Sequence, residues 1–364
     1  MTQPVAARRR AAPRRPAWGG ARLCALLCAA LGAPVVAAAQ ASPYVPLDDA
    51  AYAYVDALQA RGLLRSLSLT ERPYTAAALL RAIAEGPAPP GVAGHWLAAL
   101  RERAGRHAPR ATGGARRAGG DDPGLLAALA GRGTVQSTTR GELGLADGDG
   151  GAYAGWQARL AASWRPVVLA GRYLVDQRRR DDPDYAGPAR SGVAGRLEEG
   201  YVAGQWRYGE LFLGRVGRNW GPATLPGLQL SSEPLSYDHL YGRIGGDRVR
   251  LATLVARLDD GPGSVEPRVR RHLAAHRLTV RWRDLELAAT EGWVYSGARR
   301  RIVPAVLVPA IPLTATHYDE DRRGNLTLGG EAVWRSRLGI LGLHGMLDDY
   351  QFESGTPATE EPPS

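Results

Sequence analysis

Residues 152–164, AYAGWQARLAASW, carry the clearest period-two pattern in the chain. Every even position is apolar, whereas the odd positions include Gln157, Arg159 and Ser163. Successive side chains of a β-strand point to opposite faces, so the pattern predicts a strand with one apolar face.

The same alternation recurs along the rest of the chain, for example in 276–283 and 326–337. About eleven such runs lie between residues 133 and 350, each roughly ten residues long, which is the length that a tilted strand needs to cross a bilayer. Their apolar faces are diluted by Ala and end in Trp or Tyr, and their opposite faces are charged.

Two folds produce such alternation, a soluble β-sandwich and a membrane barrel. A sandwich core is usually dense in Val, Ile, Leu and Phe, but this chain holds only two phenylalanines against nine tryptophans and fourteen tyrosines. A charged face suits a water-filled lumen, and aromatic strand ends suit the membrane interfaces. We therefore expect a mainly β fold, an antiparallel transmembrane outer-membrane β-barrel.

The front of the chain predicts export. Residues 1–41 combine an Arg-rich start, an apolar core over 23–36 and the small residues of an A-x-A cleavage site, so we interpret them as a cleaved signal peptide. The alternative is a retained signal anchor, but the apolar run is short for a membrane span. Both cysteines, Cys24 and Cys28, lie in this segment, so the mature chain would have neither a disulfide nor a thiolate metal site.

Residues 42–104 predict a small periplasmic helical module. Asp48 or Asp49 can cap a first helix that ends near Gly62, Thr75 can cap a second, and a third spans 92–103. Residues 105–132 are expected to be a linker, 133–353 the barrel strands and 354–364 a disordered tail.

The charge balance gives little support for nucleic-acid binding. The net charge of +10 comes from arginine alone, and without residues 1–39, which hold six arginines and no acid, it falls to +4. After residue 41 no stretch is long and apolar enough for a membrane-spanning helix, because the longest candidate, 302–313, contains three prolines.

The densest motif is 214–222, GRVGRNWGP, a strand end followed by a Gly/Pro loop. Arg215 and Arg218 should lie on opposite faces unless a glycine bulge re-aims one of them. The motif is either a folding corner or a polysaccharide contact in which Trp220 stacks on a sugar. The candidate polysaccharide-binding residues in it are Arg215, Arg218, Asn219 and Trp220.

Arg277 and Arg281 complete the candidate set, within a row of lumen-facing charges. This row also holds arginines 172, 283, 335 and 337, with Glu198, Glu286 and Glu331 as candidate partners. Such ladders can attract anionic sugars, or they can hold a barrel interior together through salt bridges, which is the more common role.

No pattern predicts an enzyme, a metal site or a cofactor. His272 and His276 share a strand, where residues four apart lie about 13 Å from one another, too far to share one ion. The acidic pairs 181–182, 259–260 and 348–349 could suggest a glycosidase, but the first two run straight into turn residues and the third closes an apolar run.

Several segments together resemble the capsule assembly Wzi family of outer-membrane proteins. They are 42–49 (SPYVPLDD), 61–64 (RGLL), 71–75 (ERPYT), 216–222 (VGRNWGP), 228–234, 276–277 and 347–351 (LDDYQ). The resemblance implies an outer-membrane barrel of about 18 strands with periplasmic helices, which ties capsular or related exopolysaccharide to the cell surface as a lectin. Its partners would then be that polysaccharide, outer-membrane lipid and the barrel assembly machinery.

The chain also departs from the family. About eleven strands is too few for the family barrel, and 355–364 replaces the final amphipathic strand with a polar tail. Either the sequence is truncated or a smaller barrel closes, because an open edge in lipid leaves backbone groups unpaired. A porin-like channel through an arginine-lined lumen is the alternative function.

Overall fold

The computed structural model describes residues 41–111, 123–136, 151–177, 194–222, 225–232, 235–259, 269–297, 301–319, 324–336 and 338–348. The predicted signal peptide lies outside these residues except for Ala41, and the predicted tail lies outside them entirely.

Three helices form the predicted N-terminal module: α2 (Ala51–Gln59), α3 (Ala76–Ile83) and α4 (Val92–His107). One of the two predicted caps is found: Thr75 is the N-cap of α3, whereas the N-cap of α2 is Ala50, one residue after Asp49, and its side chain forms no cap hydrogen bond. Asp49 Oδ1 accepts the Ala51 N–H at 2.8 Å before α2, and Thr75 Oγ1 accepts the Ala78 N–H at 3.1 Å in the first turn of α3. The apolar faces of the helices pack on one another in a core that includes Val55, Leu58, Leu79 and Leu100.

The predicted boundaries after the module are wrong in two places. Helix α4 continues to His107 because the Arg103 and His107 side chains reach Asp49, at 3.6 and 2.8 Å. The predicted linker ends early, since a two-residue strand β2 (Arg110–Ala111) and the long strand β3 (Gly124–Gln136) fall within 105–136. The start of β3, GLLAALA, is apolar on both faces and therefore shows no period of two.

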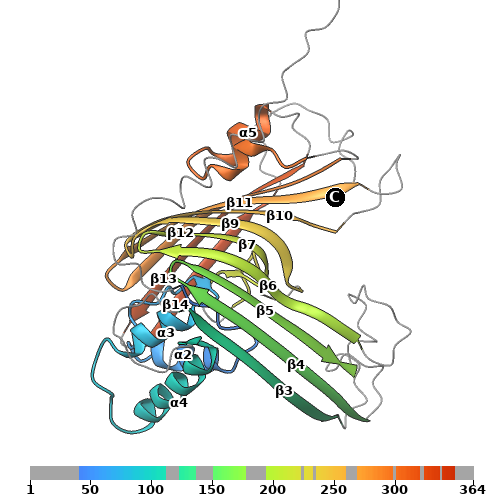
Figure 1. Cartoon of the computed structure of the whole chain (residues 1–364). Coiled ribbons are helices and arrows are strands. Elements are labelled where there is room, and N and C mark those ends of the chain that lie inside the picture. The colour runs from blue at the N-terminus through green and yellow to red at the C-terminus, as the bar shows by residue number, and fades with distance from the viewer. Residues whose placement is uncertain are drawn as a thin grey trace, which may run out of the picture. The chain divides into compact units, whose positions relative to one another are not determined.

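Twelve strands form one antiparallel sheet, which confirms the mainly β, antiparallel prediction (Figure 1). After β2 and β3 come β4 (Gly151–Trp164), β5 (Val167–Asp176), β6 (Ala194–Trp206), β7 (Gly209–Val216), β9 (Tyr237–Gly245), β10 (Val249–Arg257), β11 (Arg270–Trp282), β12 (Leu285–Gly297), β13 (Asn325–Ser336) and β14 (Gly339–Leu347). They lie side by side in chain order from β2 to β14, and these two edge strands do not pair among the described residues. A separate two-stranded sheet joins β1 (Glu71–Arg72) to β8 (Asn219–Trp220).

The connections differ sharply between the two ends of the sheet. Five of them, at 165–166, 207–208, 246–248, 283–284 and 337–338, are two or three residues long, and from β3 onward the alternate connections are much longer. Consecutive strands are antiparallel, so from β3 onward the short turns share one end of the sheet and the long loops share the other. We name these the short-turn end and the long-loop end.

Burial in several strands is the reverse of that in a soluble protein, although the charged face also buries apolar residues such as Phe212 and Leu254. In β4 the apolar Leu160 is 62% exposed, whereas its neighbour Arg159 is only 6% exposed. The same holds in β11, where Leu278 and Trp282 are exposed and Arg277 is buried. The face that carries the large exposed apolar side chains is called the outer face below, and the opposite, charged one the inner face.

Aromatic side chains line the outer face at its short-turn end. Trp164, Trp206, Tyr208, Trp282 and Trp334 all lie at or near short turns and are between 46% and 67% exposed. On the same face of β4, eight residues from Trp164, Trp156 packs on Tyr173 of β5 with 5.9 Å between ring centroids. The sheet thus has aromatic residues near both limits of its apolar outer face.

Residues 301–319 cover part of the outer face toward the long-loop end. They contain a 3₁₀ turn, η3 (Pro304–Leu307), and a short helix, α5 (Leu313–Asp319). Val306 and Leu313 pack there against Trp293, Tyr295 and Leu326. Among the described residues, no helix has the length and apolar character to cross a membrane.

Candidate functional site: the charged inner face

The N-terminal segment lies against the inner face of the sheet through three clusters of polar side chains. The first surrounds Arg277 and Glu286, the second Arg218, and the third Arg172 and Glu199. In each cluster a residue between 44 and 71 contacts side chains of the strands, so the clusters join the module to the sheet.

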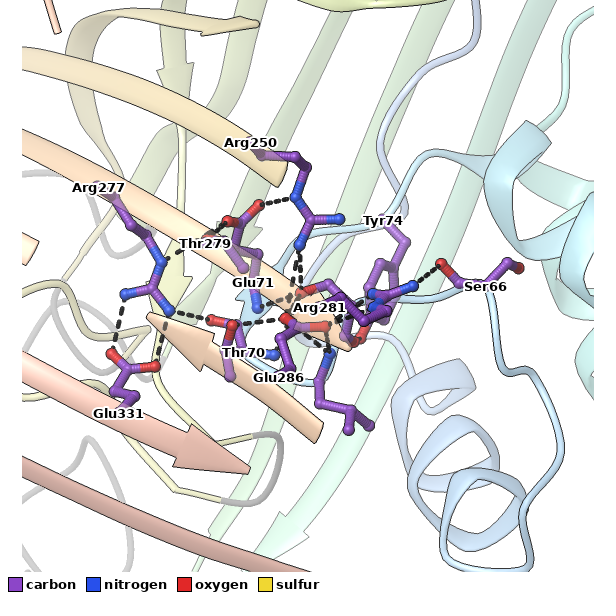
Figure 2. A network of polar contacts seen from close by, with 12 residues as sticks. Ser66, Thr70, Glu71, Tyr74, Arg250, Arg277, Thr279, Arg281, Glu286 and Glu331 are labelled. Carbon is purple, nitrogen blue, oxygen red and sulfur yellow. Dashed lines mark hydrogen bonds and ion pairs between the residues drawn. The ribbon is translucent and has the colours of Figure 1, made fainter. Parts of the chain in front are cut away.

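Arg277 is the centre of the first cluster (Figure 2). It projects from β11, is 1% exposed, and donates from Nη1 and Nη2 to the two Glu331 carboxylate oxygens of β13 at 2.9 and 2.7 Å. The Arg277 Nη2 also donates to the Thr70 carbonyl at 3.3 Å, and its Nε lies 3.6 Å from Glu71. Such a bidentate pair is stronger and more directional than a single ion pair.

Glu71 lies between two guanidinium groups. Its carboxylate is 3.6 Å from Arg277 Nε and 3.7 Å from Arg250 Nε, and it accepts the Thr279 hydroxyl at 2.7 Å. Burial by itself would raise the pKa of Glu71, but the attraction to Arg250, Arg277 and Arg243 outweighs it and lowers the pKa to about 2. Glu71 is therefore a carboxylate at any physiological pH.

Glu286 binds the residues just before Glu71. Its fully buried carboxylate accepts the Ser68 and Thr70 hydroxyls, and it pairs with Arg281 at 2.7 Å and with Arg250 at 3.5 Å. Arg281 extends the contact by donating to the Ser66 carbonyl at 3.0 Å, as Figure 2 shows. Residues 66–71, between α2 and the end of the first cluster, are thus bound to β10, β11 and β12 by hydrogen bonds and paired charges.

The second cluster encloses the Arg218 guanidinium. Its carbon lies 3.7 Å from the centre of the Tyr241 ring, and its Nε donates to His239 Nε2 at 2.8 Å. His239 Nδ1 lies 2.9 Å from the Tyr237 carbonyl, which fixes the proton on Nδ1 and leaves Nε2 as the acceptor. The Tyr44 hydroxyl donates to Glu210, and burial raises the pKa of Tyr44 well above its ordinary value, so this donor keeps its proton.

The third cluster binds Asp48 of the N-terminal segment. Arg172 Nη1 donates to Asp48 at 2.8 Å, and Arg172 Nε lies 3.3 Å from Glu199, which is 2% exposed. Arg159 lies on the other side of Glu199, at 3.9 Å. These contacts place a second part of the N-terminal segment on β4, β5 and β6.

Asn219 and Trp220 organise the loop after β7. Asn219 Oδ1 accepts the Gly227 N–H at 2.8 Å, and its Nδ2 donates to the Leu225 carbonyl at 3.2 Å. A Cβ on Gly227 would stand 2.0 Å from the Trp220 carbonyl oxygen, so only glycine fits. Trp220 is 2% exposed and pairs with Glu71 in the two-stranded sheet.

All six candidate sugar-binding residues therefore have partners within the chain, and five of them, all but Arg215, are held away from the surface. Arg218, Asn219, Trp220 and Arg277 are buried, and Arg281 is held by Glu286 and Ser66. This corrects their assignment as an accessible sugar site and supports the folding-corner and salt-bridge interpretations. Arg215 alone lies at the surface, on the outer face, where it forms a bidentate pair with Asp238 at 2.8 and 2.9 Å. The two motif arginines do lie on opposite faces, as predicted.

The histidines and acidic residues have structural partners as well. His276 Nε2 donates to the Val306 carbonyl at 2.7 Å, and His272 packs on Tyr295 with 5.3 Å between ring centroids. The Asp259 carbonyl accepts from Arg271, and Asp348 accepts from Asn325. Within the described part of the chain no three His, Cys, Asp or Glu side chains gather as metal ligands. Asp181, Asp182, Asp260, Asp349 and Arg337 lie outside the described residues.

Sequence reasoning found two acids of these clusters, Glu286 and Glu331, but missed Glu71, Glu199 and Glu210. Glu199 and Glu210 are strand residues on the inner face, and the period of two could have identified them. Tyr44 and Glu71 lie in the irregular N-terminal segment, where no periodicity indicates what they contact.

No family model matches the chain, and no curated protein matches it.

Proposed function

We propose that the chain is an outer-membrane β-barrel protein that binds capsular or related exopolysaccharide and attaches it to the cell surface, without catalysing a reaction. The observation that carries the membrane part is the inverted sheet, with apolar side chains exposed on the outer face and charged ones buried on the inner face. A contiguous apolar surface on this scale marks a membrane or protein contact rather than a surface in water.

The dimensions of the outer face match a bilayer. Trp156 and Trp164 are eight residues apart, which is about 27 Å along a strand and about 21 Å along the membrane normal at a tilt of roughly 40°. The apolar band of an outer-membrane barrel is about 25 Å tall and is bounded by aromatic girdles. By analogy with such barrels, the short-turn end would face the periplasm and the long-loop end the cell exterior.

The inner face favours attachment over conduction. Side chains from 44 to 71 occupy it over β4 to β13 through the three clusters, and each cluster matches arginines with carboxylates. A porin-like lumen needs a water-filled path with free charge along it. We therefore rank the channel second.

The binding part of the proposal rests on the resemblance to the capsule assembly Wzi family and on the exposed Arg215–Asp238 pair toward the long-loop end. Arg215 can exchange Asp238 for a uronate, pyruvyl or phosphate group, because all of them offer the same paired oxygens. Many such weak contacts along a polymer give a strong attachment in sum. No cofactor is required, and the partners are the polysaccharide, outer-membrane lipid and the barrel assembly machinery.

The test is capsule retention in an encapsulated Gram-negative strain that carries this chain as its only copy. We expect the chain in the outer membrane fraction and the capsule on the cells, with Arg215→Ala shedding more polysaccharide at equal protein level. Arg101→Ala, on the exposed surface of α4, is the matched control. Equal shedding with and without the chain, together with ion conductance in planar bilayers, would replace the attachment role with the channel.

A further inference from the structure

The exposed apolar band on the outer face does not extend equally far along every strand. On β4 the exposed apolar band reaches from Trp164 to Trp156, eight residues away. On β13 it reaches only from Trp334 to Leu328, because Leu326, the next apolar residue on that face, is 6% exposed beneath residues 301–319. Six residues correspond to about 16 Å along the membrane normal at a roughly 40° tilt, well below the 25 Å or so of a barrel's apolar band.

Polar side chains interrupt the outer face where the band on β13 ends. The Thr253 hydroxyl and His276 Nε2 both donate to the Val306 carbonyl, at 3.0 and 2.7 Å, and Glu291 accepts the Leu313 N–H at 2.8 Å. The backbone of 301–319 therefore satisfies three polar groups that would otherwise face outward beside the apolar band. A polar group left unpaired in an apolar medium is strongly unfavourable, so these contacts allow the outer face to remain apolar at this level.

The composition of this segment suits an apolar environment. Residues 302–316, IVPAVLVPAIPLTAT, contain no charged side chain, and three prolines remove three backbone N–H donors. Val306 and Leu313 are buried against the sheet, whereas Ile302, Val308 and Ile311 point away from it and are 38–45% exposed. The segment thus presents an apolar surface on both of its sides.

We propose that residues 301–319 are an interfacial anchor, which continues the apolar band over β10 to β13 and places Ile302, Val308 and Ile311 in the outer leaflet of the membrane. This inference rests on the proposed membrane location of the outer face. The occupant of the exposed apolar surface is lipid, because that surface continues the lipid-facing band at the level where the band would otherwise be too short.

The experiment uses single cysteines that carry an environment-sensitive nitrobenzoxadiazole dye, in the full chain with Cys24 and Cys28 replaced by serine. The labelled proteins are reconstituted in phosphatidylcholine vesicles with and without lipid that bears a doxyl quencher near the headgroup. Val308→Cys and Ile311→Cys report on the anchor. Leu160→Cys reports on the band itself, and Arg101→Cys, exposed on α4, reports on water.

We expect the doxyl lipid to quench the dye at Val308→Cys and Ile311→Cys at least threefold more than at Arg101→Cys, and to a degree comparable with Leu160→Cys. Quenching at Leu160→Cys with none at residues 308 and 311 would overturn the anchor and leave the membrane location standing. Absence of quenching at Leu160→Cys would overturn both.

Discussion

Replacing Glu71 by glutamine should release the N-terminal segment from the sheet. The change removes the one negative charge between Arg250 and Arg277, while the glutamine oxygen can still accept the Thr279 hydroxyl. Removing one partner of a buried ion pair typically costs about 3–5 kcal/mol, because the remaining charge is left uncompensated.

The lowered pKa of Glu71, which the same arginines cause, corresponds to a cost of similar size. It falls from 4.5 to about 2 in the folded protein, and at about 1.4 kcal/mol per unit this corresponds to about 3 kcal/mol. Because the folded pKa is the lower one, this contribution is fully present above pH 4.5 and is lost as the pH falls from 4.5 toward 2.

The assay is hydrogen exchange of the amides 66–74, followed by mass spectrometry and corrected for intrinsic rates. At pH 6 we expect Glu71→Gln to reduce their protection by about two orders of magnitude, and at pH 3 the difference from the parent should shrink to about tenfold. Glu102→Gln, at a side chain that is 75% exposed, should change protection less than twofold. Equal protection in Glu71→Gln and the parent at pH 6, or a difference independent of pH, would show that the Glu71 charge does not hold the segment on the sheet.

Three further substitutions separate the roles assigned to the two faces. Arg277→Gln should lower the free energy of unfolding by about 3–5 kcal/mol, because Glu331 loses its bidentate partner. Denaturant unfolding in detergent measures this change. A variant as stable as the parent would contradict a stabilising role for the buried Arg277–Glu331 pair. Leu160→Arg should make the free energy of folding into vesicles less favourable by about 2–4 kcal/mol, whereas Leu160→Ala should still fold. If the arginine variant folds as well as the parent, the outer face of the sheet faces water. Arg215→Ala should change stability by less than about 1 kcal/mol while weakening retention of an acidic polysaccharide, and the reverse pattern would assign Arg215 a structural role.

The period of two predicted the sheet well, because it depends only on strand geometry. It assigned the faces of β4 and β11 correctly: Arg159 lies on the inner face and Leu278 on the outer face. It failed at the start of β3, where Leu and Ala occupy both faces and no alternation remains. The start of α3 was also predictable, since Thr75 caps this helix within one turn of its own position.

The partners of the charged residues were less predictable, because they depend on contacts distant in sequence. Arg277 and Glu331 could be paired from the alternation of two neighbouring strands. The position of Glu71 between Arg250 and Arg277 depends on how an irregular segment crosses the inner face, some 200 residues away in the chain, and no local pattern encodes that path. For this reason a motif that looked like a sugar site proved to be largely a binding site for the protein's own N-terminal segment.

The most direct test of the membrane location is a lipid-contact scan along β4, with single cysteines at each residue from 157 to 163. We expect strict alternation, with dyes at 158, 160 and 162 quenched by chain-labelled lipid and those at 157, 159, 161 and 163 unaffected. Quenching that shows no alternation, or none at any position, would contradict a sheet whose apolar face lies against the bilayer.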